Sequence, residues 1–329
     1  MKIFYKILVL FFFLIFSENA FSQKDFDREI LKKMKAKKIE WGYFGGDEVA
    51  KIYKNKKWGL YAISAYDKED IDVKTIIEPK FDSLGWFDQK PFAIVKNKNK
   101  YGILLNPYEI ENAANKVECK FSKILIKEKN EAYYTLVQEN NLWGLADWFE
   151  QEIIIDCIYK TPDEVPLQNV SPWEIAIIKR AKKQLECDVI LFDSGNGDGV
   201  FKGRIKSTKK WGMYQDLEGT EIKTLIPANY DDIAFFSWNG KFTAVTQNGK
   251  IGFYLSQFSY GEQTKQSVPC IYEDYKLYDQ NNVIKLACLR DNNWGWVDWL
   301  TGEERSEFKY KTQETLPYPA YVQKEWIEE

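Results

Sequence analysis

Short stretches that alternate apolar and polar residues recur along this chain, and each one runs through a small polar turn. They are AKIYKNKKWGLYAI (50–63), AIVKNKNKYGILL (93–105), YTLVQENNLWGLAD (134–147), TAVTQNGKIGFYL (243–255) and KLACLRDNNWGWVD (285–298). A period of two on both sides of an Asn-, Asp-, Gly- or Lys-rich turn is typical of antiparallel hairpins. The pattern therefore predicts five β-hairpins.

An aromatic or apolar residue followed by glycine opens the second strand of each hairpin. The six steps are Trp58-Gly59, Tyr101-Gly102, Trp143-Gly144, Trp211-Gly212, Ile251-Gly252 and Trp294-Gly295, with separations of 43, 42, 68, 40 and 43 residues. A period of about 40 residues is typical of a repeat array. We therefore expect six units of similar structure, one of which carries an insertion.

A second element follows most of these steps and contains an aliphatic residue, a Pro or Cys, and an aromatic residue. It occurs as IIEPKFDSL, VECKFSKIL, IIDCIYKTP, LIPANYDDI and VPCIYEDYK, and its aromatic residues are Phe81, Phe121, Tyr159, Tyr230 and Tyr272. We expect these five rings to face inward. Proline at 79, 227 and 269 indicates a strand that lies at a sheet edge or begins there, because proline cannot donate to a ladder. Each unit would then supply about three strands.

Two regions depart from the regular period. In the 68-residue interval, WEIAIIK (173–179) takes the place of a hairpin strand, and residues 180–206 are predicted to form an inserted hairpin. Its Gly-rich tip (193–199) is predicted to be a turn rather than a calcium loop, because Gly and Arg occupy positions that need oxygen ligands. Residues 23–45 predict an amphipathic helix, with Phe26, Ile30, Leu31 and Met34 on one face, followed by a degenerate repeat at Trp41-Gly42.

The hairpin with its Trp-Gly step, followed by the aliphatic-Pro-x-aromatic element, resembles the WG-repeat family, also called KWG repeats. The resemblance covers residues 46–315, and residues 316–329 form a tail in which AYV (320–322) is a further predicted strand. It implies an exported or envelope-associated bacterial β-repeat protein and gives no catalytic residues to carry over. Tyr101 and Ile251 depart from the motif's tryptophan.

The predicted fold is all-β, with six units of about 42 residues and a short N-terminal helix. An open, β-solenoid-like array fits the three strands expected per unit. A six-bladed β-propeller is the alternative, since its blades have a similar period and four strands each.

The N-terminus has the pattern of a cleaved secretory signal over residues 1–22. A basic start precedes the apolar run from Ile7 to Phe16, and Ala20-Phe21-Ser22 places small residues before a cleavage site at Gln23. The run is too short to span a bilayer, which takes about 20 residues. We expect an exported protein, periplasmic, outer-membrane-associated or secreted, with no transmembrane span after cleavage.

The charge balance and the residue types that are present exclude several classes of binding and catalytic site. The balance of 46 Lys and Arg against 49 Asp and Glu lacks the basic excess of a nucleic-acid binder. Histidine is absent, which excludes Ser-His-Asp and Cys-His catalysis and imidazole zinc sites. The five cysteines, at 119, 157, 187, 270 and 288, form no CxxC pair, and their disulfide state is open. We expect no cofactor and no metal.

Candidate functional residues are few. The Trp-Gly steps are predicted to pack one unit on the next, because Ile251 occupies one such position without any ligand chemistry. Trp148, Trp296 and Trp299 follow two of the steps and are the candidate ligand contacts. Asp147 and Asp298, at matched offsets, could serve a glycoside hydrolase as a carboxylate pair, although equivalent places in distant repeats favour turns.

The sequence favours a non-enzymatic binding or scaffold module of the bacterial cell envelope, with a protein or an envelope glycan as partner. A glycan- or cell-wall-binding module that uses surface aromatics is the alternative, and an unrecognised hydrolase comes third. Burial of the three candidate tryptophans would remove the platform that a glycan module needs.

Overall fold

A computed structural model describes residues 23–44, 47–65, 71–88, 90–108, 113–193, 199–236, 241–257, 264–280 and 283–317. The predicted signal segment, most of the Gly-rich tip and the predicted strand AYV lie outside these residues. The chain divides into two compact units, one of residues 1–152 and 159–165 and the other of residues 153–158 and 166–329. Each unit is described by itself.

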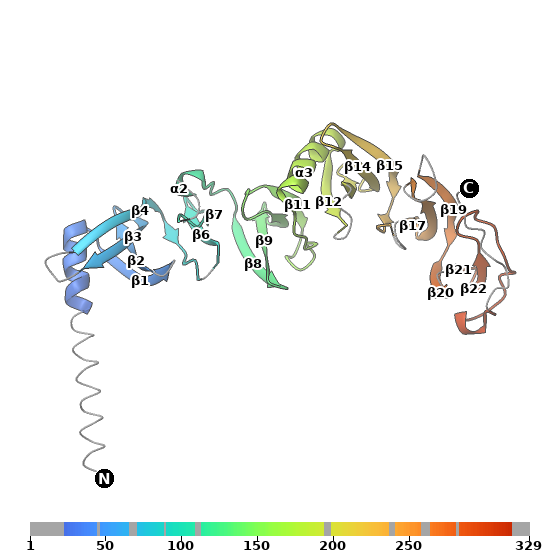
Figure 1. Cartoon of the computed structure of the whole chain (residues 1–329), viewed down its shortest axis with the longest axis horizontal. Coiled ribbons are helices and arrows are strands. Elements are labelled where there is room, and N and C mark those ends of the chain that lie inside the picture. Colours follow the sequence, from blue (N-terminus) through green and yellow to red (C-terminus); the bar gives the residue numbers. More distant parts are fainter. Residues whose placement is uncertain are drawn as a thin grey trace, which may run out of the picture. The chain divides into compact units, whose positions relative to one another are not determined.

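The described residues form six antiparallel β-sheets, which confirms the all-β prediction (Figure 1). Four sheets have four strands, in the orders β1-β2-β3-β4, β11-β10-β9-β8, β12-β13-β14-β15 and β16-β17-β18-β19. Two have three strands, β5-β6-β7 and β20-β21-β22. In every sheet the strands are neighbours in sequence order, so each is a simple meander.

The first unit begins with the predicted helix, described at residues 23–34, and continues with sheets of short strands. Its strands are β1 (Lys38–Phe44), β2 (Asp47–Lys54), β3 (Lys57–Ala65), β4 (Ile71–Phe81), β5 (Ser83–Leu84), β6 (Phe92–Asn97), β7 (Lys100–Leu105), β8 (Lys123–Lys129), β9 (Ala132–Glu139) and β10 (Leu142–Ala146). A four-residue helix, α2 (Ala113–Lys116), follows β7.

The second unit contains the helix α3 and the remaining strands. Its elements are β11 (Ile153–Tyr159, whose last residue is counted with the first unit), α3 (Pro172–Leu185), β12 (Cys187–Phe192), β13 (Val200–Ile205), β14 (Trp211–Leu217), β15 (Glu221–Tyr230), β16 (Asp232–Ile233), β17 (Phe242–Gln247), β18 (Lys250–Leu255), β19 (Lys265–Tyr272), β20 (Asp274–Gln280), β21 (Val283–Arg290), β22 (Asn293–Val297) and the 3-10 turn η1 (Gln313–Thr315).

All five predicted hairpins are confirmed, as β2–β3, β6–β7, β9–β10, β17–β18 and β21–β22. Each turns over two residues that both have positive φ: Asn55-Lys56, Lys98-Asn99, Asn140-Asn141, Asn248-Gly249 and Asp291-Asn292. Two residues with positive φ make the turn whose twist matches that of the flanking strands. Asn, Asp and Gly adopt this conformation most readily, which explains the polar turns.

The expectation of three strands per unit is wrong, because a further strand precedes each hairpin. In four repeats this strand begins two residues after the inward aromatic residue, as β5, β8, β16 and β20. Where a sheet has only three strands, isolated bridges Tyr101↔Phe121 and Trp294↔Tyr310 stand at the missing edge. The degenerate stretch at Trp41 is also one of these first strands, β1, rather than a decayed unit.

The segment WEIAIIK is a helix, not a hairpin strand. It lies in α3, where Ser171 and Glu174 form a capping box and Pro172 begins the helix. The run Ile-Ala-Ile-Ile fits a helix face as well as a strand, and the cap together with Pro at the first position selects the helix. The predicted inserted hairpin exists as β12–β13 and belongs to a regular four-stranded sheet, so the extra element is the helix that takes up residues 180–185.

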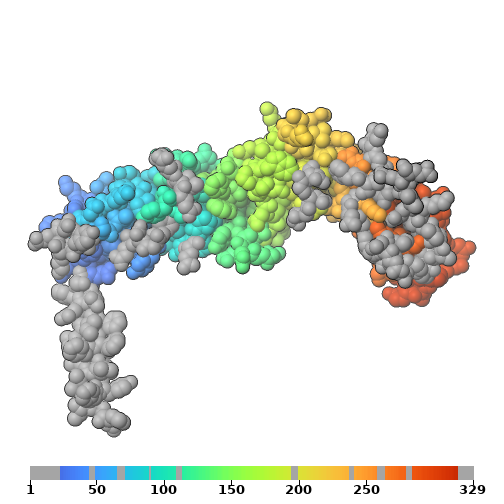
Figure 2. Space-filling view, in the orientation of Figure 1, coloured from blue at the N-terminus to red at the C-terminus, as the bar shows by residue number. Residues whose placement is uncertain are grey.

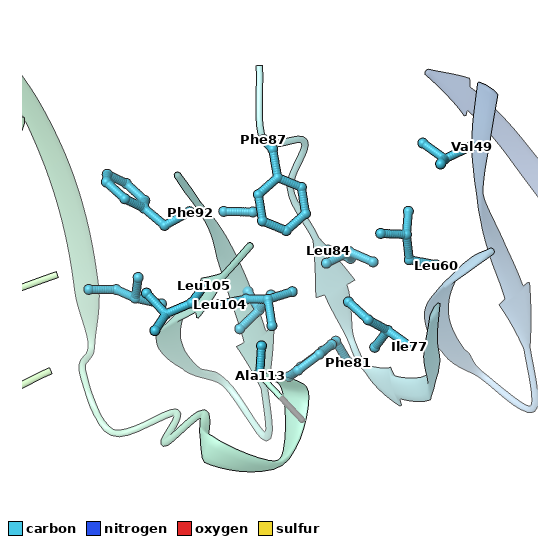
Figure 3. Packing of buried hydrophobic residues seen from close by; sticks show 13 residues of the cluster. Val49, Leu60, Ile77, Phe81, Leu84, Phe87, Phe92, Leu104, Leu105 and Ala113 are labelled. Atoms are coloured by element: carbon cyan, nitrogen blue, oxygen red, sulfur yellow. The ribbon is translucent and has the colours of Figure 1, made fainter. Parts of the chain in front are cut away.

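Apolar side chains from neighbouring sheets form a shared core in the first unit (Figure 3). Leu60 and Ile77 of the first sheet lie on one side and Leu104 of the second on the other, with Phe81 and Leu84 between them. Ile124, Tyr133 and Trp148 of the third sheet pack against the same cluster. These strands of the first unit therefore share one core, and they follow one another from blue to green in Figure 2.

The Trp-Gly glycine is required because the last strand of the sheet bulges over it. Trp58 pairs with Phe81 and Leu60 with Ile77, so Gly59 faces three residues at once. A Cβ built on Gly59 would lie 2.5 Å from the Ile77 carbonyl oxygen and 2.9 Å from the Pro79 nitrogen. Proline is tolerated here because the strand is at the sheet edge and bulged, which confirms the predicted edge position.

The same close approach of backbone to glycine recurs in other repeats. A Cβ on Gly102, Gly252 or Gly212 would lie 2.6 Å from the Glu118 oxygen, 2.6 Å from the Val268 oxygen and 3.0 Å from the Ile226 oxygen, respectively. The register shifts at the same point opposite Gly212 and Gly252. One local geometry thus explains both recurring sequence elements.

The substitution Gly59→Ala should lower the stability of the first unit by about 1–3 kcal/mol, since backbone atoms must move to accept the methyl group. The unfolding midpoint in urea and the melting temperature measure the loss. Ser64→Ala, an exposed position in the same strand, is the matched control and should change stability by no more than about 0.5 kcal/mol. Equal stability of the two variants would contradict the packing argument.

Candidate functional site

The residues of the motif are buried or half-buried. The inward aromatics Phe81, Phe121, Tyr230 and Tyr272 are buried, whereas Tyr159 is half-buried. The glycines of all six steps are buried. Their partners Trp58, Tyr101, Trp143, Trp211 and Ile251 are half-buried, and Trp294 is buried. These degrees of burial are compatible with a packing role for the motif residues.

The residue after the inward aromatic joins one hairpin to the next. In the first unit, Lys57 Nζ lies 2.5 Å from Asp82 Oδ1, and the Lys98 backbone N–H donates to Asp82 Oδ2 at 2.7 Å. Lys57 precedes the Trp-Gly step of the first sheet, and Lys98 lies in the hairpin turn of the second. Lys57 also donates to Asn97 Oδ1 at 2.8 Å. We call this lysine–carboxylate–turn arrangement the clasp.

The second unit contains the same clasp twice. Asp231 accepts from Lys210 and, at 2.6 Å, from the Asn248 N–H. Glu273 accepts from Lys250 at 2.9 Å and, more weakly at 3.4 Å, from the Asn292 N–H. In each clasp the ammonium group, followed by the backbone N–H, lowers the pKa of the carboxyl below its usual value. The sequence analysis missed these residues, although a lysine before the step and a polar residue after the aromatic recur in the chain.

Two further lysines occupy aromatic cages. Lys51 Nζ lies 4.4 Å from the ring centre of Trp86 and 5.7 Å from that of Trp58, and donates to the Leu84 carbonyl at 3.1 Å. It also lies 2.7 Å from Glu40. A ring-lined space around a cation is the geometry that binds quaternary amines. Here the chain's own lysine fills it.

The equivalent cage in the second unit has the same occupant. Lys202 Nζ lies 5.1 Å from the ring centre of Trp211 and 5.3 Å from that of Phe235, and it donates to the Ile233 carbonyl at 2.8 Å. Both lysines face the residue after the motif glycine, as the pairs Lys51↔Leu60 and Lys202↔Met213 show. The indoles of Trp58 and Trp211 therefore contact an internal cation.

The three candidate ligand contacts do not form one platform. Trp296 and Trp299 are 3% and 1% exposed, and their indole N–H groups donate to the Pro317 and Ile284 carbonyls. Trp148 is half-buried, with its ring 5.3 Å from that of Phe92 and 5.8 Å from that of Phe149. The two buried indoles have no face available for a glycan. Phe149, which the sequence analysis did not single out, is 44% exposed.

The two candidate carboxylates each shape a turn. Asp147 Oδ1 accepts from the Phe149 and Glu150 N–H groups at 3.0 and 2.6 Å. Asp298 Oδ1 accepts from the Leu300 and Thr301 N–H groups at 3.0 and 3.2 Å. Burial raises the pKa of Asp147, and these backbone donors oppose the shift. Both side chains are engaged in equivalent loops, as the turn interpretation expects.

All five cysteines are free thiols. Cys119 and Cys270 lie over the motif glycines: a Cβ on Gly102 would be 3.1 Å from Cys119 Sγ, and one on Gly252 would be 2.9 Å from Cys270 Sγ. Burial raises the pKa of both thiols and raises that of Cys187 to about 12. These small side chains fit the bulge two residues before the inward aromatic, where other repeats have Pro79 or Ala228.

A pocket of about 450 Å³ lies in the first unit beside the turn that Asp147 forms. Its wall combines apolar and charged side chains: Leu105, Lys116, Glu118, Lys120, Phe149, Glu150, Gln151 and Glu152. The turn contributes four of these residues, and the segment around α2 contributes three. Sequence reasoning identified Trp148 beside this turn and missed the pocket, because its wall joins segments about 40 residues apart.

Within the described ranges, no group of three or more Cys, Asp or Glu side chains is arranged to hold a metal ion. No helix in this part of the chain has the length and apolar character needed to cross a membrane.

The substitutions Asp82→Asn and Asp231→Asn should each lower stability at neutral pH. A carboxyl whose pKa is lower in the folded state stabilises the fold above its unfolded pKa, which is about 3.9 for Asp. That contribution disappears as the pH falls through the lowered folded value. Urea unfolding at pH 7 and at pH 2–3 should therefore show a gap between wild type and variant that closes in acid.

Asp72→Asn, at an exposed position of β4, is the control for these substitutions and should behave like the wild type at both pH values. A gap for Asp82→Asn or Asp231→Asn that persists unchanged in acid would show that the clasp's charge is not what stabilises the junction.

Comparison with known proteins gives only remote structural similarity. No family model matches this chain, and no curated protein matches it. Similar solved structures include Hsv2p of Kluyveromyces lactis (9% identity, 79% of this chain and 74% of that one, TM-score 0.25) and a protein from Lactobacillus plantarum (9%, 80% and 82%, 0.22). The dihydro-heme d1 dehydrogenase NirN is also similar (9%, 76% and 50%, 0.26). The similarity is to β-propeller proteins, and at these scores it supports no argument about how the six sheets are arranged.

Proposed function

We propose that this chain is a non-enzymatic, exported repeat protein that acts as a binding or scaffold module in a bacterial cell envelope. One observation carries the proposal: the motif residues are engaged within the chain. The glycines accept a bulged strand, Lys57, Lys210 and Lys250 pair in clasps, and Trp58 and Trp211 enclose lysines. The repeat therefore serves the scaffold, and binding falls to residues that differ between units.

Exposed apolar side chains supply candidate contact points outside the motif. Leu125 on the edge strand β8 is 39% exposed, and Trp173 at the start of α3 is 45% exposed. Strand edges and aromatic residues are common elements of protein interfaces. A protein partner is the first expectation, and an envelope glycan is the alternative.

Export rests on the sequence of residues 1–22. The helix that follows the predicted cleavage site supports this boundary, because Ile30 is fully buried against Ala50, Ile52 and Tyr61 of the first sheet. A fold that begins at residue 23 would keep this helix intact after cleavage.

We expect the protein isolated from its source bacterium to begin at Gln23 and to be found outside the cytoplasm. A photo-crosslinking residue at position 125 or 173 should capture a defined partner, whereas the same residue at the exposed polar position 74 should not. Amino-terminal sequencing and mass spectrometry of the products give the readout.

An uncleaved cytoplasmic chain, or the absence of any partner at both apolar positions, would overturn this proposal. A hydrolytic activity that disappears in Asp147→Asn/Asp298→Asn would favour the third hypothesis. Because both carboxylates hold turns, the melting temperature of that variant has to match the wild type for this conclusion.

For the arrangement of the six sheets, we propose the open array. The last sheet supports it: Val297 and Trp294 bridge to Glu304 and Tyr310, so this sheet is extended by its own C-terminal segment without a strand from the N-terminus. The four-strand meanders support the alternative, because a propeller blade has four strands.

Small-angle X-ray scattering distinguishes the two arrangements. A compact ring of the mature length should have a radius of gyration of about 19 Å, from the size dependence of globular domains. We expect a value well above this for the open array. A measured radius near that of the compact ring would replace the array with the propeller.

A further inference from the structure

The pocket beside the Asp147 turn differs from the rest of the repeat surface. It is about 450 Å³, within the range of about 300–1,000 Å³ that small-molecule sites occupy. Leu105, which is buried, supplies an apolar wall, and Phe149 supplies an exposed ring. The inward aromatics and caged indoles described above do not line it.

The last sheet contains an equivalent turn with other residues at these positions. Both turns begin with an aspartate whose backbone N–H donates, at 2.8 Å, to the carbonyl five residues later, Asp147 to Glu152 and Asp298 to Glu303. Where the last sheet has Gly302 with φ of 78°, the third sheet has Gln151 with φ of 57°. Glycine adopts this region without steric cost, whereas a side chain makes it less favourable.

Glycine would therefore suit this turn better than glutamine does. The Gln151 side chain nevertheless lies in the pocket wall, next to Phe149 and Glu150, where the last sheet has Leu300 and Thr301. Gln151 is therefore a polar residue of the pocket wall at a position where the last sheet has no side chain.

The Phe149 ring is exposed but held in place. Trp148 meets it edge to face, with an interplanar angle of 87°, and Trp148 in turn packs on Phe92. Phe92 is buried in the core of the first unit. A ring fixed in this way presents a flat apolar face to the solvent at little entropic cost.

The polar wall matches a ligand with many hydroxyl groups. It contains two lysines and three glutamates, of which Lys120 and Glu118 pair with each other at 3.3 Å, and the amide of Gln151 can both donate and accept. A hydroxyl also donates and accepts. The three carboxylates oppose an anionic ligand, and the two ammonium groups oppose a cationic one.

We propose that this pocket binds a neutral carbohydrate, with Phe149 stacked on a sugar ring and Gln151 and Glu150 hydrogen-bonded to its hydroxyls. The inference rests on the proposed binding function and names a ligand class for it. The site uses an aromatic that the sequence analysis did not consider and needs neither Trp296 nor Trp299.

The turn of the last sheet supplies the test variant. Phe149→Leu/Glu150→Thr/Gln151→Gly copies Leu300, Thr301 and Gly302, a sequence that forms this turn in the same protein. Gln151→Gly alone removes the side chain, and glycine adopts the positive φ of this position without steric cost. This variant should therefore fold at least as well as the wild type. The reverse exchange, Leu300→Phe/Thr301→Glu, controls for turn sequence without the pocket; it keeps Gly302, because a Cβ there would lie 2.3 Å from the Ser267 carbonyl oxygen.

The mature chain is titrated by calorimetry with neutral trisaccharides (chitotriose, cellotriose, maltotriose), with sialyllactose as anion and with trilysine as cation. We expect one neutral sugar to bind with a dissociation constant below about 1 mM. The triple variant should bind it at least about 10-fold more weakly and Gln151→Gly about 3-fold or more, with melting temperatures unchanged or raised. The reverse exchange should not alter binding.

Equal sugar affinity of the triple variant and the wild type would overturn the proposal, as would failure of every neutral sugar or a preference for sialyllactose or trilysine. Crosslinking of a protein partner at positions 125 and 173 in the triple variant would show that the broader binding function stands even where the sugar site fails.

Discussion

In each repeat where it occurs, the close approach of the edge-strand backbone to the motif glycine is the contact on which the rest of the repeat depends. At Gly59 the bulged edge strand comes so near that a single methyl group would overlap its carbonyl. A bulge turns the following side chains. Phe81 consequently points into the core between sheets, and its neighbour Asp82 points to Lys57 and to the next hairpin turn.

After Phe81, Tyr230 and Tyr272, neighbouring repeats are linked by two kinds of contact that arise from adjacent residues. The aromatic ring buries apolar surface between sheets, and the carboxylate holds the next turn by charge-assisted hydrogen bonds. In repeat proteins, stability is carried largely by such contacts between nearest neighbours. The clasp does not occur at Phe121, where Ser122 donates instead to the Gln138 carbonyl, so the junctions are not equivalent.

The difference between residues that recur in the repeats and residues that do not is relevant to function. Residues that recur, such as the motif glycines and the clasp lysines, have partners inside the chain. Residues that differ between equivalent positions are released from that role, and the comparison of Gln151 with Gly302 shows this most clearly. A binding site in such a protein is better sought in differences between repeats than in the motif that defines them.

The sequence by itself determined the hairpins, their turns, the inward aromatics and the all-β class, because alternation and turn chemistry are local properties. Only the tertiary structure decided the strand that precedes each hairpin, since β5 and β16 have two residues and show no period. It also decided that Trp296 is buried. The pocket joins Leu105 to Phe149 through packing between sheets, and contacts between distant segments leave no periodic signal in a single chain.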